Sequence, residues 1–442
     1  MRFFDGFFIR DRIIVWKGSI KYMDTINEAI QLVETGNIDD AMTLLADKTT
    51  NASDDEKFMI VELYYEWGFF EEAIKLLEDL MAKYPQEGEI IALLAEINIE
   101  LEKDDIAIEL LNSINSDDPF YAAALIQLAD LYQAQGLFEV SEQKLMEAKR
   151  LYPDELVIDF ALGELLFSIG QPNRAIPFYE RVVKETKEMN QILIEERLAE
   201  SYASIGNYEA ALAYYERLDS EHPDILFKYG FTAFQQKRHD LAIQVWKKLI
   251  EIDPYYHTVY EELARALKEE NLMEDAFEIV QKGLEMDEFN KGLFFQAGEL
   301  SYELERIEES IDYLQNALAL DQDYKKAVLY LARIYKDIDK HEEIIRLITD
   351  IKATGAIDPL YDWMLARAYN EMEEYKEALQ SYKEASIGLQ DDVEFLKEYG
   401  YFLMEEGLVQ EAKQTLMKYS ELEPLDEEVV EYLERLNDSN YH

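Results

Sequence analysis

Small side chains recur along this chain at a nearly constant interval of 34 residues. Twelve positions mark the repeat, and all but one hold Ala or Ser: Ala41, Ala73, Ala107, Ser141, Ala175, Ala211, Ala242, Ala276, Ser310, Ile344, Ala378 and Ala412. The interval departs from 34 only as 32 after Ala41, 36 before Ala211 and 31 after it. A fixed period of this length predicts an array of similar helical units, each burying its apolar face against its neighbours.

The apolar positions within the period predict two helices in each unit. With each marker counted as position 20, position 8 holds Ala29, Val61, Ala95, Ala129, Gly163, Ala199, Gly230, Ala264, Gly298, Ala332, Ala366 and Gly400. Larger apolar side chains recur at positions 7 and 24, such as Leu94 and Leu162 at 7 and Leu77 and Trp246 at 24. Small residues twelve apart, on either side of a turn, let two antiparallel helices approach closely. We therefore expect positions 7, 8, 20 and 24 to form the core.

Glycine and proline mark the ends of these helices. Position 15 holds Gly36, Gly68, Gly136, Gly170, Gly206 and Gly407, which suit a left-handed turn residue between the two helices. Position 32 holds Pro85, Pro119, Pro153, Pro223, Pro254 and Pro424, where proline ends the second helix and precedes the next unit.

Segments such as GNYEAALAYYERL (206–218) and EYKEALQSYKEA (374–385) carry this pattern in full. With them the chain resembles the tetratricopeptide-repeat (TPR) family over about residues 23–424, and more narrowly the long acidic members from Gram-positive bacteria of the Bacillus type. The resemblance implies an all-α fold: a right-handed α-solenoid, or superhelix, of about twelve helix-turn-helix repeats with a C-terminal capping helix. It also implies that positions 5, 9 and 12 of each first helix face a concave groove.

Several units depart from the pattern. Ile344 replaces a small marker, so we expect looser packing there, and Pro359 comes three residues later than the register expects, which predicts a delayed helix start. The unequal intervals around Ala211 place an irregularity at about residues 185–230. There Pro223 and Gly230 stand seven apart where ten is usual, which predicts a first helix shortened by nearly one turn.

These features suggest a domain organisation. Repeats 1–6 are assigned to residues 23–219, repeats 7–12 to 220–425, and a capping helix and tail to 426–442. Residues 1–22 lie outside the register and carry five basic and two acidic side chains. We interpret them as an upstream extension before a natural start at Met23, with a basic anchor or capping segment as the alternative.

Charge and composition exclude several function classes. With 94 acidic against 43 basic residues the formal net charge is -51, which disfavours nucleic acid and anionic lipid as partners. Cysteine is absent, so disulfides, thiol nucleophiles and Cys-ligated zinc are excluded, in keeping with a cytoplasmic protein. No apolar stretch reaches the roughly 18 residues of a membrane span.

Signals for catalysis are weak. The histidines are His222, His239, His257, His341 and His442, and none stands four residues from another, the spacing of a helical zinc site. No Gly-rich phosphate loop and no GxSxG elbow occurs. We therefore expect no catalytic, cofactor-binding or metal-binding residues and no enzyme activity.

The predicted groove changes sign midway along the chain. Position 9 holds Ile30, Glu62, Glu96, Asp130, Glu164, Glu200, Phe231, Arg265, Glu299, Arg333, Arg367 and Tyr401. Together with aromatic and lysine side chains at positions 5 and 12, the predicted partner-binding set is Phe58, Glu62, Tyr65, Glu96, Asp130, Glu164, Phe167, Glu200, Phe227, Phe231, Phe234, Arg265, Lys268, Phe295, Arg333, Lys336, Trp363 and Arg367. The alternative is that the aromatic residues belong to the core and the acids are merely solvated.

The leading hypothesis is a non-catalytic scaffold that binds peptide segments or a protein partner in the groove. Basic residues of the partner would lie near the acidic half, and an acidic segment near Arg265, Arg333 and Arg367. A regulatory or co-chaperone-like adaptor that gates a partner's activity is the alternative. An RNA-binding repeat should be basic throughout the groove, which the first six units contradict. The partner's identity and the oligomeric state stay undetermined.

Overall fold

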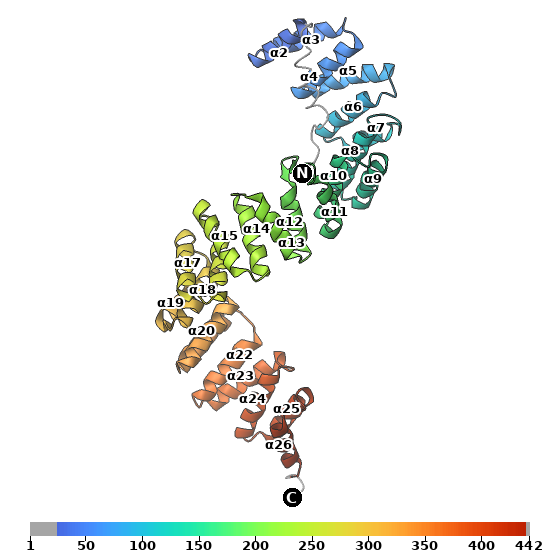
Figure 1. Cartoon of the computed structure of the whole chain (residues 1–442). Coiled ribbons are helices and arrows are strands. Elements are labelled where there is room, and N and C mark those ends of the chain that lie inside the picture. Colours follow the sequence, from blue (N-terminus) through green and yellow to red (C-terminus); the bar gives the residue numbers. More distant parts are fainter. Residues whose placement is uncertain (1–23, 439–442) are drawn as a thin grey trace. The chain divides into compact units, whose positions relative to one another are not determined.

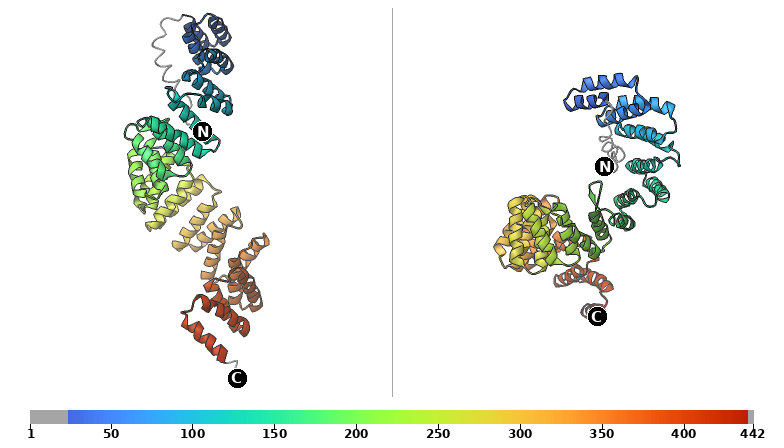
Figure 2. Two further views of the ribbon diagram at one scale, coloured as in Figure 1. Left: turned by 90° about the vertical axis from the view of Figure 1, so that its right-hand side faces the viewer. Right: turned by 45° about the horizontal axis from the view of Figure 1, so that its top comes forward.

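The computed structural model describes residues 24–438, so the interpretation of residues 1–22 and of the start at Met23 falls outside the described residues. Within that range the chain forms 25 helices and one two-stranded hairpin (Figure 1). Apart from the last helix, they pack as twelve consecutive antiparallel pairs. Figure 2 shows the helices from two further directions. The predicted all-α helical-repeat fold is therefore confirmed.

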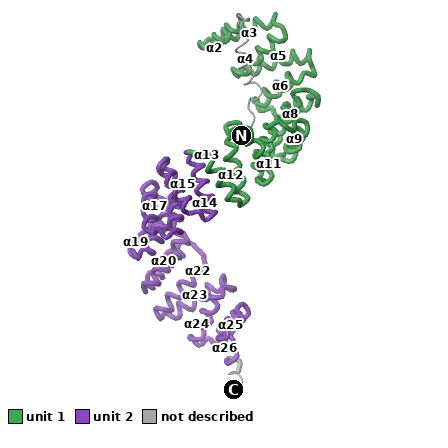
Figure 3. Tube along the Cα trace, in the orientation of Figure 1, with its two compact units in different colours: residues 1–220 green, residues 221–442 purple. Residues whose placement is uncertain are grey.

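Two compact units divide the chain between Ser220 and Glu221 (Figure 3). The first contains α2 (Asp24–Glu34), α3 (Ile38–Thr49), α4 (Asp54–Glu66), α5 (Phe70–Lys83), α6 (Gly88–Glu100), α7 (Asp104–Asn112), α8 (Tyr121–Ala134), α9 (Phe138–Leu151), α10 (Leu156–Ser168), α11 (Pro172–Val182), β1 (Glu188–Met189), β2 (Ile192–Leu193), α12 (Ile194–Ser204) and α13 (Tyr208–Leu218).

The second unit continues the same alternation of helices. It contains α14 (Pro223–Gln235), α15 (His239–Ile252), α16 (Thr258–Glu269), α17 (Met273–Met286), α18 (Lys291–Glu303), α19 (Ile307–Leu320), α20 (Lys325–Asp337), α21 (His341–Ala353), α22 (Pro359–Glu371), α23 (Tyr375–Gly388), α24 (Val393–Glu405), α25 (Val409–Leu422) and α26 (Glu427–Asp438). The unpaired α26 is the expected C-terminal capping helix. It begins beside Asp426, whose pKa is lowered to about 2 by hydrogen bonds from Lys397 and Tyr419.

The predicted core positions are buried in both units. All twelve residues at position 8 and all twelve markers are buried, as are the position-24 side chains Tyr179 and Trp246. Glycine at position 8 makes room for the largest of these side chains: a Cβ on Gly163 would lie 2.6 Å from the Tyr179 ring, and one on Gly230 would overlap Trp246. The 34-residue period thus identifies the helix contacts correctly.

A left-handed residue closes the turn within every helix pair. The six predicted glycines all have positive φ, from 73° at Gly170 to 84° at Gly36. Position 15 is left-handed in the other six repeats as well, where it holds Glu102, Lys237, Asn271, Glu305, Asp339 and Glu373. The turn geometry is therefore a property of the repeat and not of glycine alone.

The irregularity expected at about residues 185–230 is present, but its form differs from the prediction. Strands β1 and β2 pair in a hairpin whose central residues, Asn190 and Gln191, both have positive φ, as a type I′ turn requires. The first helix α14 keeps 13 residues and is not shortened. The second helix before it, α13, is cut to 11 residues and ends at the left-handed Asp219.

Two predictions about proline are wrong: Pro223 does not end a second helix, and Pro359 does not delay the start of a first helix. Each is the first residue of a helix, α14 and α22, where its missing N–H costs nothing and its fixed φ suits the first turn. Because α22 begins 34 residues after α20, the predicted delay does not occur. By contrast, Pro85, Pro153, Pro254 and Pro424 follow the end of a second helix, as expected.

Ile344 loosens its helix pair, as predicted. It is buried on α21, and α20 and α21 approach one another less closely than the two helices of each of the other eleven antiparallel pairs within residues 24–438. The bulk of an isoleucine at a position built for alanine keeps the two backbones apart. Within residues 24–438, no helix combines the length and apolar character that crossing a membrane requires.

Candidate functional site

Positions 5, 9 and 12 lie on the first helices of the pairs. In the second unit α14, α16, α18 and α20 contact one another in sequence, so side chains at one repeat position form a row. Of the residues predicted to bind a partner, some contact other side chains of the chain and others line an accessible cavity.

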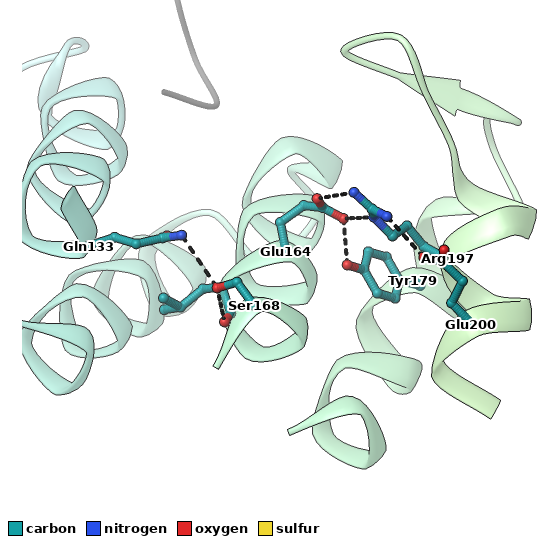
Figure 4. Close-up of polar contacts among 7 residues, drawn as sticks. Gln133, Glu164, Ser168, Tyr179, Arg197 and Glu200 are labelled. Atoms are coloured by element: carbon teal, nitrogen blue, oxygen red, sulfur yellow. Dashed lines mark hydrogen bonds and ion pairs between the residues drawn. The ribbon is translucent and has the colours of Figure 1, made fainter. Parts of the chain in front are cut away.

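Glu164, on α10, is an internal residue and not an open groove ligand. Its side chain is only 3% exposed. It accepts hydrogen bonds from the Tyr179 hydroxyl at 2.5 Å and from Arg197 Nε at 2.8 Å, and Arg197 also bonds Glu200 at 3.0 Å (Figure 4). Burial and the Glu164 charge raise the pKa of Tyr179, which keeps its proton on the shared bond. The prediction for Glu164 is corrected, because Arg197 reaches it from the next repeat.

The other groove residues predicted in the first unit are half-buried. Tyr65 donates to Glu96 at 3.0 Å, and Phe58 packs on the core. Arg197 lies over the Phe167 ring at 5.1 Å. The acids Glu62, Glu96, Asp130 and Glu200 each interact with other groups of the chain. The cavity beside Asp130 holds only about 10 Å³, enough for one water, so it offers no pocket for a partner side chain.

Three aromatic residues line one face of α14 and form what we call the aromatic patch: Phe227, Phe231 and Phe234. Phe227 and Phe234 flank Trp246, with ring centroids 6.3 and 6.2 Å from it. Phe231 lies between them in sequence and is 41% exposed. Of the three residues of the aromatic patch, Phe231 therefore exposes the most apolar surface to solvent.

The adjoining charged positions on α16 and α18 are partly satisfied within the chain. Arg265 is ion-paired with Glu262 and lies over the Phe234 ring at 4.8 Å. On α18, burial raises the pKa of Glu299, and the nearby positive charge of Lys268 partly offsets this rise. Phe295 packs edge-on against Tyr324 and Tyr330 and belongs with the core. For Phe295 the core interpretation holds.

Trp363, on α22, is 7% exposed, so the prediction that it faces an open groove is wrong. Its indole N–H donates to Glu398 at 2.8 Å, and Arg367 stacks over its ring at 3.9 Å. Arg367 also donates through Nε and Nη2 to Glu398, as does the Tyr382 hydroxyl. Although burial opposes ionisation, these donors hold the pKa of Glu398 below its ordinary value.

The two internal networks occupy equivalent repeat positions with opposite charges. In both, position 9 of one repeat pairs with position 6 of the next, and a tyrosine at position 24 completes the contact. Glu164 meets Arg197 in the first unit, whereas Arg367 meets Glu398 in the second. The sign of position 9 therefore reflects inter-repeat packing at these two sites.

A cavity of about 420 Å³ is lined mainly by α20, α21 and α22, with one residue each from α23 and α24, and we call it the cationic cavity. Its lining consists of Ala332, Arg333, Lys336, His341, Ile344, Met364, Arg367, Ala368, Asn370, Glu371, Tyr382 and Glu398. Arg333 is 63% exposed and lies 3.8 Å from Asp337, a loose contact. Lys336 is exposed one turn further along α20.

The structure thus brings together Arg333, Lys336 and Arg367 from the predicted set. Because Arg367 is committed to Glu398, Arg333 and Lys336 supply the accessible positive charge, opposite the exposed acid Glu371 of the same lining. A guanidinium and an ammonium side by side suit the carboxylates of an acidic segment. His341 and Ile344 also line this site but were not predicted, although Ile344 was the one marker that was not small. Within residues 24–438, no three acidic or histidine side chains are grouped so as to hold a metal ion.

Family models match most of the array. YpiA-like C-terminal tetratricopeptide repeats match residues 359–426, and YpiA-like tetratricopeptide repeats match 133–187. General tetratricopeptide-repeat models match 196–257 and 292–324, and the ARM repeat of tetratricopeptide repeat protein 21 matches 17–135.

A curated relative matches nearly end to end. It is the TPR repeat-containing protein YpiA of Bacillus subtilis (strain 168), 40% identical over 415 residues, which cover 93% of this chain and 98% of the relative. Among solved structures, YrrB, a TPR protein with an unusual peptide-binding site, is 17% identical with a TM-score of 0.37, over 42% of this chain and 96% of that one. Naa15/Naa10 bound to HypK-THB is 16% identical with a TM-score of 0.42, over 88% of this chain and 66% of that one.

Proposed function

Because this chain belongs to the tetratricopeptide-repeat family, among its YpiA-like members, we propose that it is a non-catalytic cytoplasmic scaffold that binds a protein partner. The second unit takes an acidic segment of that partner, with its carboxylates in the cationic cavity. The observation that carries the proposal is the exposed pair Arg333 and Lys336 at the rim of a cavity of about 420 Å³.

The surrounding charge makes this site selective. The chain carries a formal net charge of -51, so its general field repels an acidic segment. Binding of such a segment must therefore come from local contacts, which favours well-placed charge pairs over nonspecific attraction. Of the predicted cationic residues, Arg333 and Lys336 carry this role. Arg265 is paired with Glu262 and Arg367 with Glu398, and Lys268 lies near Glu299, so their charges are already opposed within the chain. A role for Glu62, Glu96, Asp130 and Glu200 in holding basic residues stays a prediction.

Crosslinking in the native host tests the proposal. A photoreactive residue at Met364, on the cavity wall, would capture a segment bound there, and mass spectrometry would identify the crosslinked peptide. We expect an acidic segment, captured by the otherwise unchanged chain and lost from R333E/K336E. The control is R346E, a single charge reversal at an exposed arginine on α21 that lies outside the cavity and pairs with Glu343 at 3.2 Å.

Three results are informative. Loss of the crosslink in R333E/K336E alone supports the proposal. Equal loss in R346E would show that only net charge matters, and an unchanged crosslink in R333E/K336E would remove the cavity from the account.

A further inference from the structure

We infer that the segment recognised by the second unit has two parts: a large apolar side chain that packs on Phe231, and a group of carboxylates about eight residues away that enters the cationic cavity. This inference rests on the proposed function and deepens it, because it states what distinguishes the right acidic segment from any other.

Phe231 has the properties of an anchor site. It is 41% exposed while its neighbours Phe227 and Phe234 are held against Trp246, so the surface beneath a bound side chain is already rigid. Arg265 extends this surface by lying over Phe234 at 4.8 Å. Aromatic side chains on a fixed support are the usual centres of binding energy at protein interfaces.

Phe231 and Arg333 occupy the same repeat position, three repeats apart. The first helices between them, α14, α16, α18 and α20, contact in sequence, so the two residues lie on one continuous row. Packed helices are roughly 8–10 Å apart, which places the two sites about 25–30 Å apart along the row. An extended chain advances about 3.3 Å per residue, so about eight residues bridge that distance.

The surface between the two sites disfavours further acidic residues. Arg265, at position 9 of the next repeat, is already paired with Glu262. Glu299, at position 9 of the repeat after it, is itself an acid, and its burial raises its pKa. A carboxylate placed there would meet this acid, so the charged residues of the partner gather at the cavity and the connecting residues are uncharged.

Synthetic peptides test the inference with the full chain. The probe carries a fluorophore, one tryptophan, an eight-residue spacer of Gly, Ser and Asn, and four glutamates, and is made in both orders because the direction of the segment is open. One comparator replaces the tryptophan by serine, and a second shortens the spacer to two residues. Binding is measured by fluorescence anisotropy at constant ionic strength.

We expect one order of the probe to bind about tenfold more tightly than either comparator, since a buried aromatic contact contributes about that much. F231A should lower its affinity to that of the serine comparator. The control F289A removes an equally large aromatic that is 72% exposed on a loop outside the row, and it should change nothing.

The outcomes separate this inference from the proposed function. If the serine comparator binds as tightly as the probe and still depends on Arg333 and Lys336, the two-part segment is wrong and the acidic site stands. If all peptides bind the unchanged chain and R333E/K336E equally, both ideas fail. If the short-spacer peptide matches the probe, the spacing and the continuous row are wrong.

Discussion

At the scale of single residues, the left-handed backbone conformation at position 15 recurs in all twelve repeats. Six repeats meet it with glycine and six with a residue that has a Cβ, such as Lys237 and Glu305. A non-glycine residue pays roughly 1–2 kcal/mol in this conformation. The glycines were predictable from the sequence, whereas Glu or Lys at a turn gives no comparable signal.

Glu305→Gly should stabilise the chain. Relief of the left-handed conformation outweighs the greater entropy of glycine in the unfolded chain, leaving a gain of about 0.5–1 kcal/mol. The midpoint of thermal unfolding should rise. The reverse change, Gly136→Ala, should lower it, although a Cβ there meets nothing within 4 Å, because the strain is purely in the backbone. A fall of the midpoint in Glu305→Gly would contradict this reading of the turn.

The opposite charges at equivalent positions predict the result of a charge swap. Arg367→Glu alone places two acids together beside Trp363 and should cost about 2 kcal/mol, a moderate figure because Arg367 and Glu398 are each about one third exposed. The double change R367E/E398R recreates the Glu164–Arg197 arrangement and should recover most of that loss.

Urea denaturation followed by circular dichroism measures both variants. A double variant no more stable than Arg367→Glu would show that the two networks are not interchangeable. This pairing also explains why the sequence misplaced Glu164 and Trp363. Their burial depends on which residue at position 6 of the next repeat contacts them, and the residue type at a single position does not predict that contact.

At the scale of helices, one side chain sets the spacing of α20 and α21. Ile344 and Ile348 are both buried on α21, one turn apart, but only Ile344 stands where other repeats hold a small residue. The cationic cavity opens beside it, so a departure from the repeat creates the candidate site.

Ile344→Ala should therefore cost less stability than Ile348→Ala. Removing a buried isoleucine typically costs 2–5 kcal/mol, with the smaller values where the structure can close the gap. At position 344 the helices can move to the spacing of the other pairs, whereas position 348 has no such freedom. Thermal unfolding compares the two, and the acidic probe peptide should bind Ile344→Ala more weakly. Equal losses of stability would indicate that α20 and α21 are held apart by something else.

Element boundaries were harder to predict than element contacts. The period of 34 located twelve helix pairs and the irregular region, because small residues are required wherever two backbones meet. It placed Pro223 at the end of a second helix and not at the start of the next, since proline can follow one helix or begin the next. The hairpin β1–β2 was not predicted. Each strand has only two residues, too few to show an alternating pattern on either side of the turn at Asn190 and Gln191.

At the scale of the molecule, the excess of acidic groups governs behaviour in solution. A formal net charge of -51 destabilises compact structure through repulsion, which salt screens over about 10 Å at 0.1 M. The midpoint of thermal unfolding should rise between about 0.01 and 0.15 M sodium chloride. A midpoint that falls over this range would mean that attractive ion pairs outweigh the general repulsion.

One titration decides whether this acidic array binds an acidic segment through Arg333 and Lys336. A fluorescent tetraglutamate-bearing peptide is titrated with the full chain, with R333E/K336E and with R346E, and its anisotropy is recorded. We expect saturable binding to the unchanged chain and to R346E, and loss of that binding in R333E/K336E. Equal affinity for all three proteins, or a preference for a tetralysine peptide at the same cavity, would contradict it.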